Sequence, residues 1–529
     1  MGFLLRAGKS IRETIDSVDN ENGLFYDLIS FDPRGVGLSE PAIRCVNDPQ
    51  LDRSWQIREM EEGVFESSDA ALGRLWSMSV ARGLSCSLPQ VDQGAGDIRE
   101  FVSTASVARD MLEIVERHGE WRQRETEGIV QAAAAAATQT KAQSESLLQR
   151  LRHRPGEEKI QYWGFSYGTY LGNTFAAMFP DRVHRIVVDG VVDAYNYRQT
   201  LWSDNLLDTE KALDTFYHHC ARVGHPACAL ANETGPTTAE GVRQRVANIT
   251  TSLYHNPLPV ISPNPEIITY SDIRNLIGTS LYTPIPSFPH MANVLAAVER
   301  GNATAFADLL RSYHTYSCPS NNQTTSTRNH SNNDASLSHD ATMAIACTDG
   351  EDQSTLTQPT FAAYARALAH TSPSIGSIWS THRLHCIHYR VRARHRFQNA
   401  WEANTSHPIL LIGNTADPVT PGVFAHTMAR GFRGAVALTQ DSAGHCSTSA
   451  HSACTVGFVR RYFQTGELPP VNTTCEADEV PFGDGRGGDE VGVSEAKRRT
   501  RRMNRALHEV GGGFMRLGML GKMRDAWFD

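Results

Sequence analysis

The 529-residue sequence contains 40% hydrophobic and 20% charged residues, a balance that predicts a globular protein with a sizeable core and excludes a disordered or collagen-like chain. Its 50 Lys and Arg against 58 Asp and Glu give a net charge of −8, which does not favour nucleic acid as a partner. No apolar run is long enough to cross a bilayer, so the sequence predicts no membrane span.

The periodicity of apolar residues predicts an alternation of helices and strands along the chain. In chain order, we expect helix 2–16, strand 24–31, helix 97–118, strand 160–163, helix 169–178, strand 185–189, strand 408–412 and strand 435–439. Strands that alternate with helices favour a parallel sheet covered by helices, so the predicted fold class is α/β.

A long segment with helical patterns and many prolines separates strands 185–189 and 408–412, and it is large enough to form a lid. Beyond Glu476 the composition changes to glycine and charged residues, which is typical of a solvated tail. The sequence therefore predicts four regions: the first part of the sheet core over 1–195, a lid over 196–400, the C-terminal part of the core over 401–475 and a tail over 476–529.

Cysteines and glycosylation sequons bear on the compartment. Ten cysteines are enough for several disulfides in an oxidising environment. Seven Asn-x-Ser/Thr sequons, which favour a secreted glycoprotein, occur at Asn232, Asn248, Asn302, Asn322, Asn329, Asn404 and Asn472. The apolar run Phe3–Leu5 within residues 1–20 is too short for the core of a signal peptide. We predict a secreted protein on the evidence of the remaining chain.

The strongest chemical signal is the sequence Gly164-Phe-Ser166-Tyr-Gly168 between a predicted strand and a predicted helix. A serine on such a tight turn is lifted above the sheet, and the flanking glycines let the backbones approach each other. The turn predicts Ser166 as a nucleophile and the backbone N–H of Tyr167, at the helix N-terminus, as a donor to the oxyanion of acyl transfer. The alternative is a glycine-rich turn that carries an inert serine.

A serine nucleophile needs a base that an acid orients, and in this architecture the chain order is serine, acid, histidine. Asp417 follows strand 408–412 and His445 follows strand 435–439, so both are expected at the carboxyl edge of the sheet. We therefore predict a triad that these two residues form with Ser166. Three other acids compete for the role of Asp417, namely Asp441, Asp189 and Asp193.

Five stretches resemble the tripeptidyl-aminopeptidase and proline-iminopeptidase branch of the α/β-hydrolases, in particular its secreted fungal members. They are Phe31-Asp-Pro-Arg-Gly-Val-Gly-Leu-Ser39, Tyr162-Trp-Gly-Phe-Ser-Tyr-Gly-Thr169, Asp189-Gly-Val-Val-Asp193, Pro408-Ile-Leu-Leu-Ile-Gly-Asn-Thr-Ala-Asp-Pro-Val-Thr-Pro421 and Gly444-His445. The resemblance implies the α/β-hydrolase fold with a mostly helical lid. It also implies Ser166 as nucleophile, His445 as general base and acid, and Asp417 as the acid that orients His445.

This family removes short peptides or single residues from N-termini, so the resemblance implies a peptide substrate with a free N-terminus. Spacing alone does not fix disulfide connectivity. The resemblance implies four disulfides and leaves Cys318 and Cys446 unassigned. The implied pairs are Cys45–Cys86, Cys220–Cys228, Cys347–Cys386 and Cys454–Cys475.

Cofactor and metal motifs are weak. The run His382-Arg-Leu-His385-Cys386-Ile-His388 has a spacing that a zinc site uses, but no second ligand pair with matching spacing accompanies it. Gly35-Val-Gly37 lacks the third glycine and the acidic partner of a dinucleotide site. We predict no cofactor and no metal.

Three functions remain open at this point: a serine exopeptidase, a carboxylesterase or lipase on the same triad, and a catalytically impaired paralogue that only binds its ligand. A lid rich in His, Asn and Thr favours peptides over the apolar substrates of an esterase. The sequence does not define the oligomeric state. A substrate with a free amine requires acidic groups in the pocket, and the candidates are Asp193, Asp349, Glu351 and Asp352.

The family's glycine-rich oxyanion loop and the strand before it precede the helix predicted here over 2–16, so both would lie upstream of Met1. We expect this sequence to be a shortened form of a longer chain, with a secretion signal upstream as well. The loop supplies one donor to the oxyanion, and loss of such a donor typically costs about 100- to 1000-fold in turnover. We therefore expect low stability and little activity from residues 1–529 alone.

Overall fold

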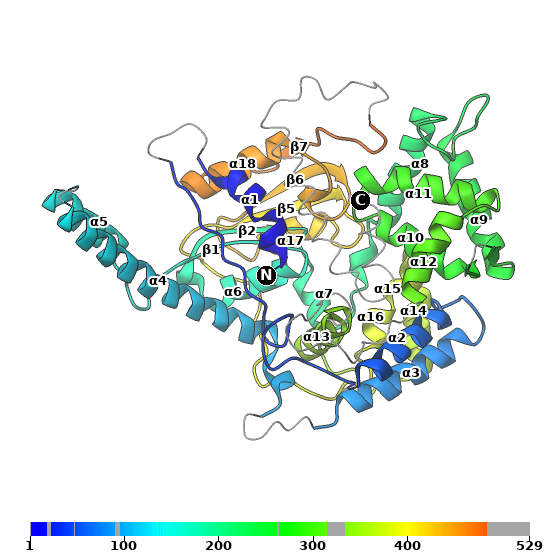
Figure 1. Ribbon diagram of the computed structural model, residues 1–529, viewed down its shortest axis with the longest axis horizontal. Helices are drawn as coiled ribbons and strands as arrows, with labels where there is room; N and C mark the ends of the chain where they lie inside the picture. Colours follow the sequence, from blue (N-terminus) through cyan, green and yellow to red (C-terminus); the bar gives the residue numbers. More distant parts are fainter. Residues whose placement is uncertain are drawn as a thin grey trace.

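The computed structural model describes residues 2–17, 23–46, 48–89, 96–136, 138, 140–261, 264–314 and 334–483. Within these ranges, five parallel strands form the central sheet in the order β1-β2-β5-β6-β7 (Figure 1). The strands are β1 (Ile160–Phe165), β2 (Val183–Asp189), β5 (Leu410–Ala416), β6 (Val436–Ala443) and β7 (Thr474–Glu476). The predicted α/β fold class is confirmed.

Side chains alternate between the two faces along each strand, and helices bury both faces of the sheet. Ile186 and Val188 of β2 pack with the helices on one face, whereas Val187 between them packs on the other face. The first face is covered by α4 (Thr104–Ala135), α6 (Tyr167–Met178) and α17 (Val423–Ala429), and the second by α1 (Gly2–Ile15) and α18 (Ala453–Thr465) (Figure 1). Helix α5 (Lys141–Leu151) runs along α4, and both project from the body of the protein (Figure 1).

Between β2 and β5 the chain forms a layer of helices beside the sheet, drawn in green to yellow in Figure 1. It includes one short antiparallel ribbon of β3 (Leu258–Val260) and β4 (Glu266–Ile268). The helices are α7 (Ala194–Arg198), α8 (Thr209–Val223), α9 (Ala239–His255), α10 (Tyr270–Ser280), α11 (Pro284–Glu299), α12 (Thr304–His314), α13 (Asp334–Asp349), α14 (Gln358–Thr371), α15 (Gly376–Trp379) and α16 (Thr381–Leu384).

Two helices that precede β1 in the chain also join this layer. They are α2 (Pro49–Glu62) and α3 (Ala71–Cys86). Leu75 of α3 shares a hydrophobic cluster with Phe361 of α14 and Leu384 of α16. The layer is therefore built from two segments of the chain. The predicted division of the sequence at residues 195 and 400 stays a prediction.

The strand expected over 24–31 is wrong. These residues form no ladder with any strand in the described ranges, and side chains hold their backbone instead. The Leu24 N–H donates to Gln464 Oε1 at 2.9 Å, and the Tyr26 N–H donates to Asp16 Oδ1 at 2.8 Å. An apolar run forms a strand only where a neighbouring strand supplies the ladder. The helix expected over 97–118 begins later, at Thr104, as α4.

All four disulfides implied by the family resemblance are present, Cys45–Cys86, Cys220–Cys228, Cys347–Cys386 and Cys454–Cys475. Cys446 is buried with a free thiol. Cys318, Asn322, Asn329 and most of the predicted tail lie outside the described residues. Among the helices that the structure does describe, none combines the length and the apolar character needed to cross a membrane.

Candidate active site

The three residues of the predicted triad lie at one edge of the sheet. Ser166 follows β1, Asp417 follows β5, and His445 lies just beyond the end of β6. Because these strands are parallel, their carboxyl ends meet at the same edge, which is where ligands of such sheets bind. The fold therefore brings together residues that are far apart in the sequence.

Ser166 occupies a strained turn between β1 and α6. Its φ of 54° and ψ of −121° are unusual for a residue with a side chain. The Ser166 N–H donates to the Asp189 carbonyl oxygen at 3.0 Å. The Ser166 carbonyl oxygen accepts the N–H and the hydroxyl of Thr169 at 2.8 and 2.6 Å. Helix α6 begins directly after the turn, at Tyr167. The backbone around Ser166 is thus fixed from both sides.

Gly164 allows β1 and α6 to approach each other at this turn. A Cβ atom on Gly164 would lie 2.4 Å from Cε1 of Tyr162 and 2.6 Å from the carbonyl oxygen of Gly168. The Tyr162 hydroxyl donates to that same oxygen at 2.8 Å. Since real Cβ atoms do not come so close to a backbone oxygen, the position requires glycine.

His445 and Asp417 form a buried pair. Nδ1 of His445 lies 3.0 Å from each carboxylate oxygen of Asp417. The carboxylate also accepts the backbone N–H groups of Val419, Thr420 and Cys446 at 3.0, 2.8 and 2.9 Å. Burial alone would raise the pKa of Asp417, but His445 and these donors hold the pKa below its ordinary value. Because a carboxylate only accepts, Nδ1 of His445 carries a proton.

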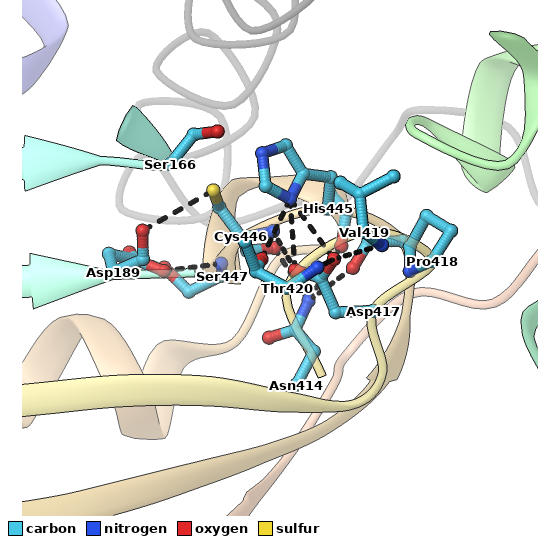
Figure 2. A network of polar contacts seen from close by, with 12 residues as sticks. Ser166, Asp189, Asn414, Asp417, Pro418, Val419, Thr420, His445, Cys446 and Ser447 are labelled. Atoms are coloured by element: carbon cyan, nitrogen blue, oxygen red, sulfur yellow. Dashed lines mark hydrogen bonds and ion pairs between the residues drawn. The ribbon is translucent and has the colours of Figure 1, made fainter. Parts of the chain in front are cut away.

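The other ring nitrogen of His445 faces Ser166. Nε2 is buried and has no hydrogen-bond partner among the described residues. Figure 2 shows the Ser166 hydroxyl on the side of the imidazole ring opposite Asp417. A ring held at Nδ1 and open at Nε2 toward a serine is the geometry of a general base for that serine.

The rival acids have other partners. Asp189 accepts both the N–H and the hydroxyl of Ser447, at 2.8 and 2.5 Å, and burial raises its pKa to about 6 although Ser447 opposes the shift. Asp193 caps α7, and Asp441 accepts the hydroxyl of Thr415 at 2.8 Å. Of the acids in the described ranges, only Asp417 hydrogen-bonds to His445.

Cys446 adds a thiol to this cluster. The ligand atoms of Asp417, His445 and Cys446 lie within 4.8 Å of one another, which is the one such group of three found among the described residues. Burial, together with the charges of Asp189 and Asp417, raises the pKa of the Cys446 thiol well above its ordinary value. A metal ligand has to be a thiolate, so this group fits the pairing of His445 with Asp417 better than a metal ion.

A pocket opens above Ser166, between the sheet edge and the helical layer. Its wall is mostly apolar and aromatic, and it contains no carboxylate within the described part of the chain. The pocket is lined by Ser166, Tyr167, Val192, Tyr197, Trp202, Asn205, Tyr282, Thr342, Met343, Ile345, Ala346, Cys347, Trp379, His382, His385, Cys386, Val419 and Thr420. The polar composition of the lid is therefore not the composition of the pocket.

The acidic residues expected to meet a free amine are not where the sequence reasoning placed them. Asp193, Asp349, Glu351 and Asp352 are all absent from the residues that line the pocket in the described structure. Glu351 pairs with Arg396 at 3.2 Å. This expectation is wrong because acidity in the sequence does not indicate which side of a loop faces the cavity.

Asp349 instead supports the wall of the pocket from behind. Its carboxylate accepts the N–H and the hydroxyl of Thr104 at 2.7 and 2.6 Å. The Thr104 hydroxyl lies 2.5 Å from the hydroxyl of Tyr167, the residue directly after Ser166. Burial raises the pKa of Asp349 to about 7, against the opposing effect of Thr104 and of two nearby arginines.

Two family models match the chain. A model described as alpha/beta hydrolase fold matches residues 12–256, and a model described as TAP-like protein matches residues 372–475. Together they cover β1 and β2 with Ser166, and β5 and β6 with Asp417 and His445. The two matches together identify an α/β-hydrolase with a TAP-like C-terminal region, and the chain is a serine hydrolase.

The curated relatives share a low sequence identity with this chain, but they match it over most of its length. Serine protease Hip1 of Mycobacterium tuberculosis is 24% identical over 485 residues, which cover 85% of this chain and 74% of that protein. Tripeptidyl aminopeptidase of Streptomyces lividans is 24% identical over 457 residues, with 86% and 71% of the two chains covered. Carboxylesterase B of Mycobacterium tuberculosis is 23% identical over 464 residues, with 85% and 73% covered.

Several residues of the site carry no signal in the sequence. The hydroxyl of Thr420 lies 3.1 Å from Nδ1 of His445, and the Tyr282 carbonyl oxygen accepts the His445 N–H at 2.9 Å. Trp202 and Trp379 line the pocket from different segments of the helical layer. Single tryptophans and threonines have no characteristic spacing, so only the folded chain identifies them.

Proposed function

We propose that Ser166, His445 and Asp417 are the catalytic triad of this serine hydrolase. Ser166 Oγ attacks the carbonyl carbon of the substrate while Nε2 of His445 takes the hydroxyl proton. His445 then gives that proton to the leaving amine, and an acyl-enzyme on Ser166 remains. A water molecule, deprotonated by the same nitrogen, releases the acyl group and restores the serine. Asp417 holds the imidazole in the tautomer that this exchange requires.

The backbone N–H of Tyr167 is our candidate for an oxyanion donor. It is the first residue of α6, where the partial positive charge of the helix lies closest to the acylated serine. The single observation that best supports the triad is the strained turn at Ser166, facing an imidazole whose other nitrogen is fixed by a buried carboxylate.

We further propose that the enzyme is an exopeptidase that releases short peptides or single residues from free N-termini. The supporting facts are the names of the relatives, a serine protease and a tripeptidyl aminopeptidase, and the extent over which they match this chain. The pocket around Ser166 is lined on its far side by the helical layer, as in an enzyme that accepts the end of a chain.

The triad is tested with Ser166→Ala, and Ser252→Ala on the exposed side of α9 is the matched control. We expect Ser166→Ala to lose hydrolysis and covalent labelling by a serine-directed phosphonate, and Ser252→Ala to keep both. Labelling that persists on another serine in Ser166→Ala would overturn the assignment.

The substrate class is tested with trialanine p-nitroanilide and its N-acetyl form. A charge-assisted hydrogen bond to the amine is worth roughly 1.5–3 kcal/mol, so the free peptide should be cleaved roughly ten- to a hundred-fold faster. Equal rates would contradict an aminopeptidase.

The second candidate is a carboxylesterase, which the relative named Carboxylesterase B and the apolar wall of the pocket favour. Turnover of p-nitrophenyl butyrate without turnover of either anilide would favour that alternative, because an ester acyl chain needs no amine subsite. Both candidates use the same triad, so Ser166→Ala abolishes either activity.

Secretion and glycosylation are also proposals. Asn232, Asn248, Asn302, Asn404 and Asn472 are exposed in the structure, as a glycosylated asparagine has to be. The four disulfides are compatible with an oxidising compartment. Endoglycosidase treatment of protein made in a eukaryotic host would lower its apparent mass if these sites are used.

A further inference from the structure

The end of the pocket away from the sheet is a wall of two tryptophans and two histidines. The His382 ring packs against Trp379 at a tilt of 38° with centroids 4.5 Å apart, and it makes an edge contact with Trp202 at 6.2 Å. Trp379 Nε1 donates to the Trp202 carbonyl oxygen at 2.8 Å. His385 lies one turn further along, and all four residues line the pocket.

This wall includes a strained turn. Thr200 and Trp202 have φ values of 60° and 45°, in the left-handed region that residues with side chains rarely adopt. Side chains of the helical layer hold the turn: the Tyr364 hydroxyl donates to the Leu201 carbonyl oxygen at 2.5 Å, in addition to the bond from Trp379. Backbone strain of this kind persists where the surroundings enforce it and is concentrated at functional sites.

His382 presents a hydrogen-bond acceptor to the cavity. Its Nδ1 lies 2.9 Å from the carbonyl oxygen of Trp379, and a carbonyl only accepts, so Nδ1 carries the proton. Burial lowers the pKa of His382 to about 4, which keeps the ring neutral near pH 7. Nε2 therefore keeps its lone pair, and it makes no hydrogen bond to any of the described residues.

His385 presents a second acceptor by the same logic. Its Nε2 lies 3.1 Å from Oε1 of Glu59. Burial alone would raise the pKa of Glu59, but His385, His339 and Arg82 lower it to about 2, so Glu59 is a carboxylate and His385 Nε2 donates to it. Burial lowers the pKa of His385, although Glu59 opposes this shift, and Nδ1 of the neutral ring keeps its lone pair.

The charges behind this wall are negative on balance. Asp52 and Asp340 are buried carboxylates, Glu59 is a partly exposed one near the same Arg82, and Arg82 pairs with Asp52 at 2.9 Å and with Asp340 at 2.7 Å. Among the fixed charges, the carboxylates outnumber the guanidinium groups even when Arg53, which lies near Asp52, is counted; His339, with Nδ1 3.8 Å from Asp340, is a titratable neighbour of the same groups. Glu59 therefore places a negative charge one imidazole ring away from the cavity. A cation in the pocket is attracted there without touching a carboxylate.

We infer that His382 and His385 bind the N-terminal ammonium group of the substrate, with Trp202 and Trp379 as its aromatic surroundings. An ammonium group supplies three N–H donors, and the two imidazole nitrogens accept from it. The faces of the tryptophan rings attract the same positive charge. This inference rests on the proposed aminopeptidase function and assigns its specificity to residues outside the triad.

The position of this subsite fits an enzyme that measures from the N-terminus. Ring centroids follow one another from Tyr167 to Tyr197, from Tyr197 to Trp202 and from Trp202 to His382, at 6.2, 5.8 and 6.2 Å. One wall of the pocket thus leads from the neighbour of Ser166 to the two histidines. A substrate whose amine binds at His382 has its reactive carbonyl held at a set distance along that wall.

The test compares two substrates that differ only in the amine. Trialanine p-nitroanilide carries the ammonium group, and propionyl-dialanine p-nitroanilide has a hydrogen in its place. We define the amine ratio as kcat/KM for the first divided by kcat/KM for the second. Because both substrates are measured on one preparation, the ratio is independent of the fraction of folded enzyme.

We expect His382→Leu to lower the amine ratio roughly 10- to 100-fold, mainly through KM, because it removes an acceptor for a charged donor. His382→Gln, which keeps an acceptor near the position of Nε2, should retain a larger ratio than His382→Leu. Glu59→Gln, which keeps the bond to His385 and removes the charge, should lower the ratio by a smaller factor. His219→Leu in α8 is the control, since His219 is half-buried like His382 but lies outside the pocket.

The outcomes separate the two proposals. A wild-type amine ratio near one overturns the aminopeptidase function and this inference with it. A large wild-type ratio that His382→Leu and Glu59→Gln both leave unchanged overturns this inference alone. A ratio that His219→Leu lowers as much as His382→Leu does would also overturn it, because the effect would then come from any buried histidine of the helical layer.

Discussion

Asn414 holds the backbone on both sides of His445. Its side-chain Nδ2 donates to the carbonyl oxygens of Gly444 and Cys446 at 2.9 and 2.6 Å, and these two residues flank His445 in the chain. Asn414 is itself buried in β5, three residues before Asp417. One amide therefore ties the loop of the proposed catalytic base, His445, to the strand that precedes its proposed acid, Asp417.

We predict that Asn414→Leu lowers both stability and turnover. The change leaves the buried carbonyl oxygen of Gly444 without a donor, at a cost of about 1–3 kcal/mol, and leaves the Cys446 carbonyl oxygen with the Ser449 N–H at 3.1 Å. It also frees the His445 loop, and a displacement of about 1 Å in a catalytic group costs about 100-fold in rate. Thermal unfolding and kcat measure the two effects, with Asn399→Leu at an exposed position as the control. A variant with unchanged kcat would show that His445 keeps its position without Asn414.

Two glycines allow a matched test of the turn at Ser166. In Gly164→Ala the new Cβ would meet the Gly168 backbone at 2.6 Å, so β1 and α6 have to separate and Ser166 has to move. We expect Gly164→Ala to lose most phosphonate labelling of Ser166 and to unfold at a lower temperature. The new Cβ of Gly128→Ala, at an exposed position in the C-terminal part of α4, meets nothing within 4 Å.

Gly128→Ala should therefore stabilise the protein by about 0.5–1 kcal/mol, the usual gain from alanine over glycine in a helix. It should leave the labelling rate as it is. Wild-type labelling in Gly164→Ala would mean that the turn tolerates a wider spacing than the contact with Gly168 indicates.

The sequence predicts the parts of the site that depend on local patterns. Ser166 lies in a motif that contains its own turn, and Asp417 and His445 each follow an apolar strand, so their positions at one sheet edge follow from parallel strand order. Trp202 and Trp379 are linked by a hydrogen bond across 177 residues, and no local pattern contains that contact. The prediction of a strand over 24–31 was wrong for a related reason, because a strand pairs only with another strand that can lie far away in the sequence.

The histidines of the pocket illustrate the same limit. The spacing of His382 and His385 is that of metal ligands, but the group that each histidine can bind depends on the hydrogen-bond partner of its other ring nitrogen. Those partners are the Trp379 carbonyl oxygen and Glu59, and Glu59 comes from α2, hundreds of residues earlier in the chain. The orientation of an imidazole is a tertiary property, so the sequence leaves its function open.

Cys446 should be inert in the folded enzyme. The thiol is buried, it lies 3.4 Å from the Asp189 carbonyl oxygen, and its pKa is raised by burial and by nearby carboxylates. Reaction with a thiol reagent requires an accessible thiolate. In a Cys318→Ser background, we expect no labelling of Cys446 by iodoacetamide at pH 8 and one labelled cysteine after denaturation. Labelling of the native enzyme with loss of activity would show that this loop opens.

The raised pKa of Asp349 implies that the stability of the protein depends on pH. Burial raises its pKa to about 7, whereas an unfolded aspartate titrates near 3.8. Between these values the folded state holds a proton that the unfolded state has lost, so the free energy of unfolding falls as the pH rises through this window. The contribution of Asp349 is fully present below about pH 4 and is lost as the pH passes 7.

Asp349→Asn removes this titration and keeps the hydrogen bonds. The amide oxygen accepts the Thr104 N–H, the amide nitrogen donates to the Thr104 hydroxyl, and that hydroxyl donates to Tyr167. We therefore expect the melting temperature of Asp349→Asn, relative to wild type, to increase steadily from pH 4 to pH 8. The exposed Asp352→Asn serves as the control and should show a flat difference between pH 5 and pH 8, since bonds from Ser354 hold the pKa of Asp352 below its ordinary value despite partial burial. A flat or falling difference for Asp349→Asn would mean that Arg392 and Arg396 keep this carboxylate ionised at neutral pH.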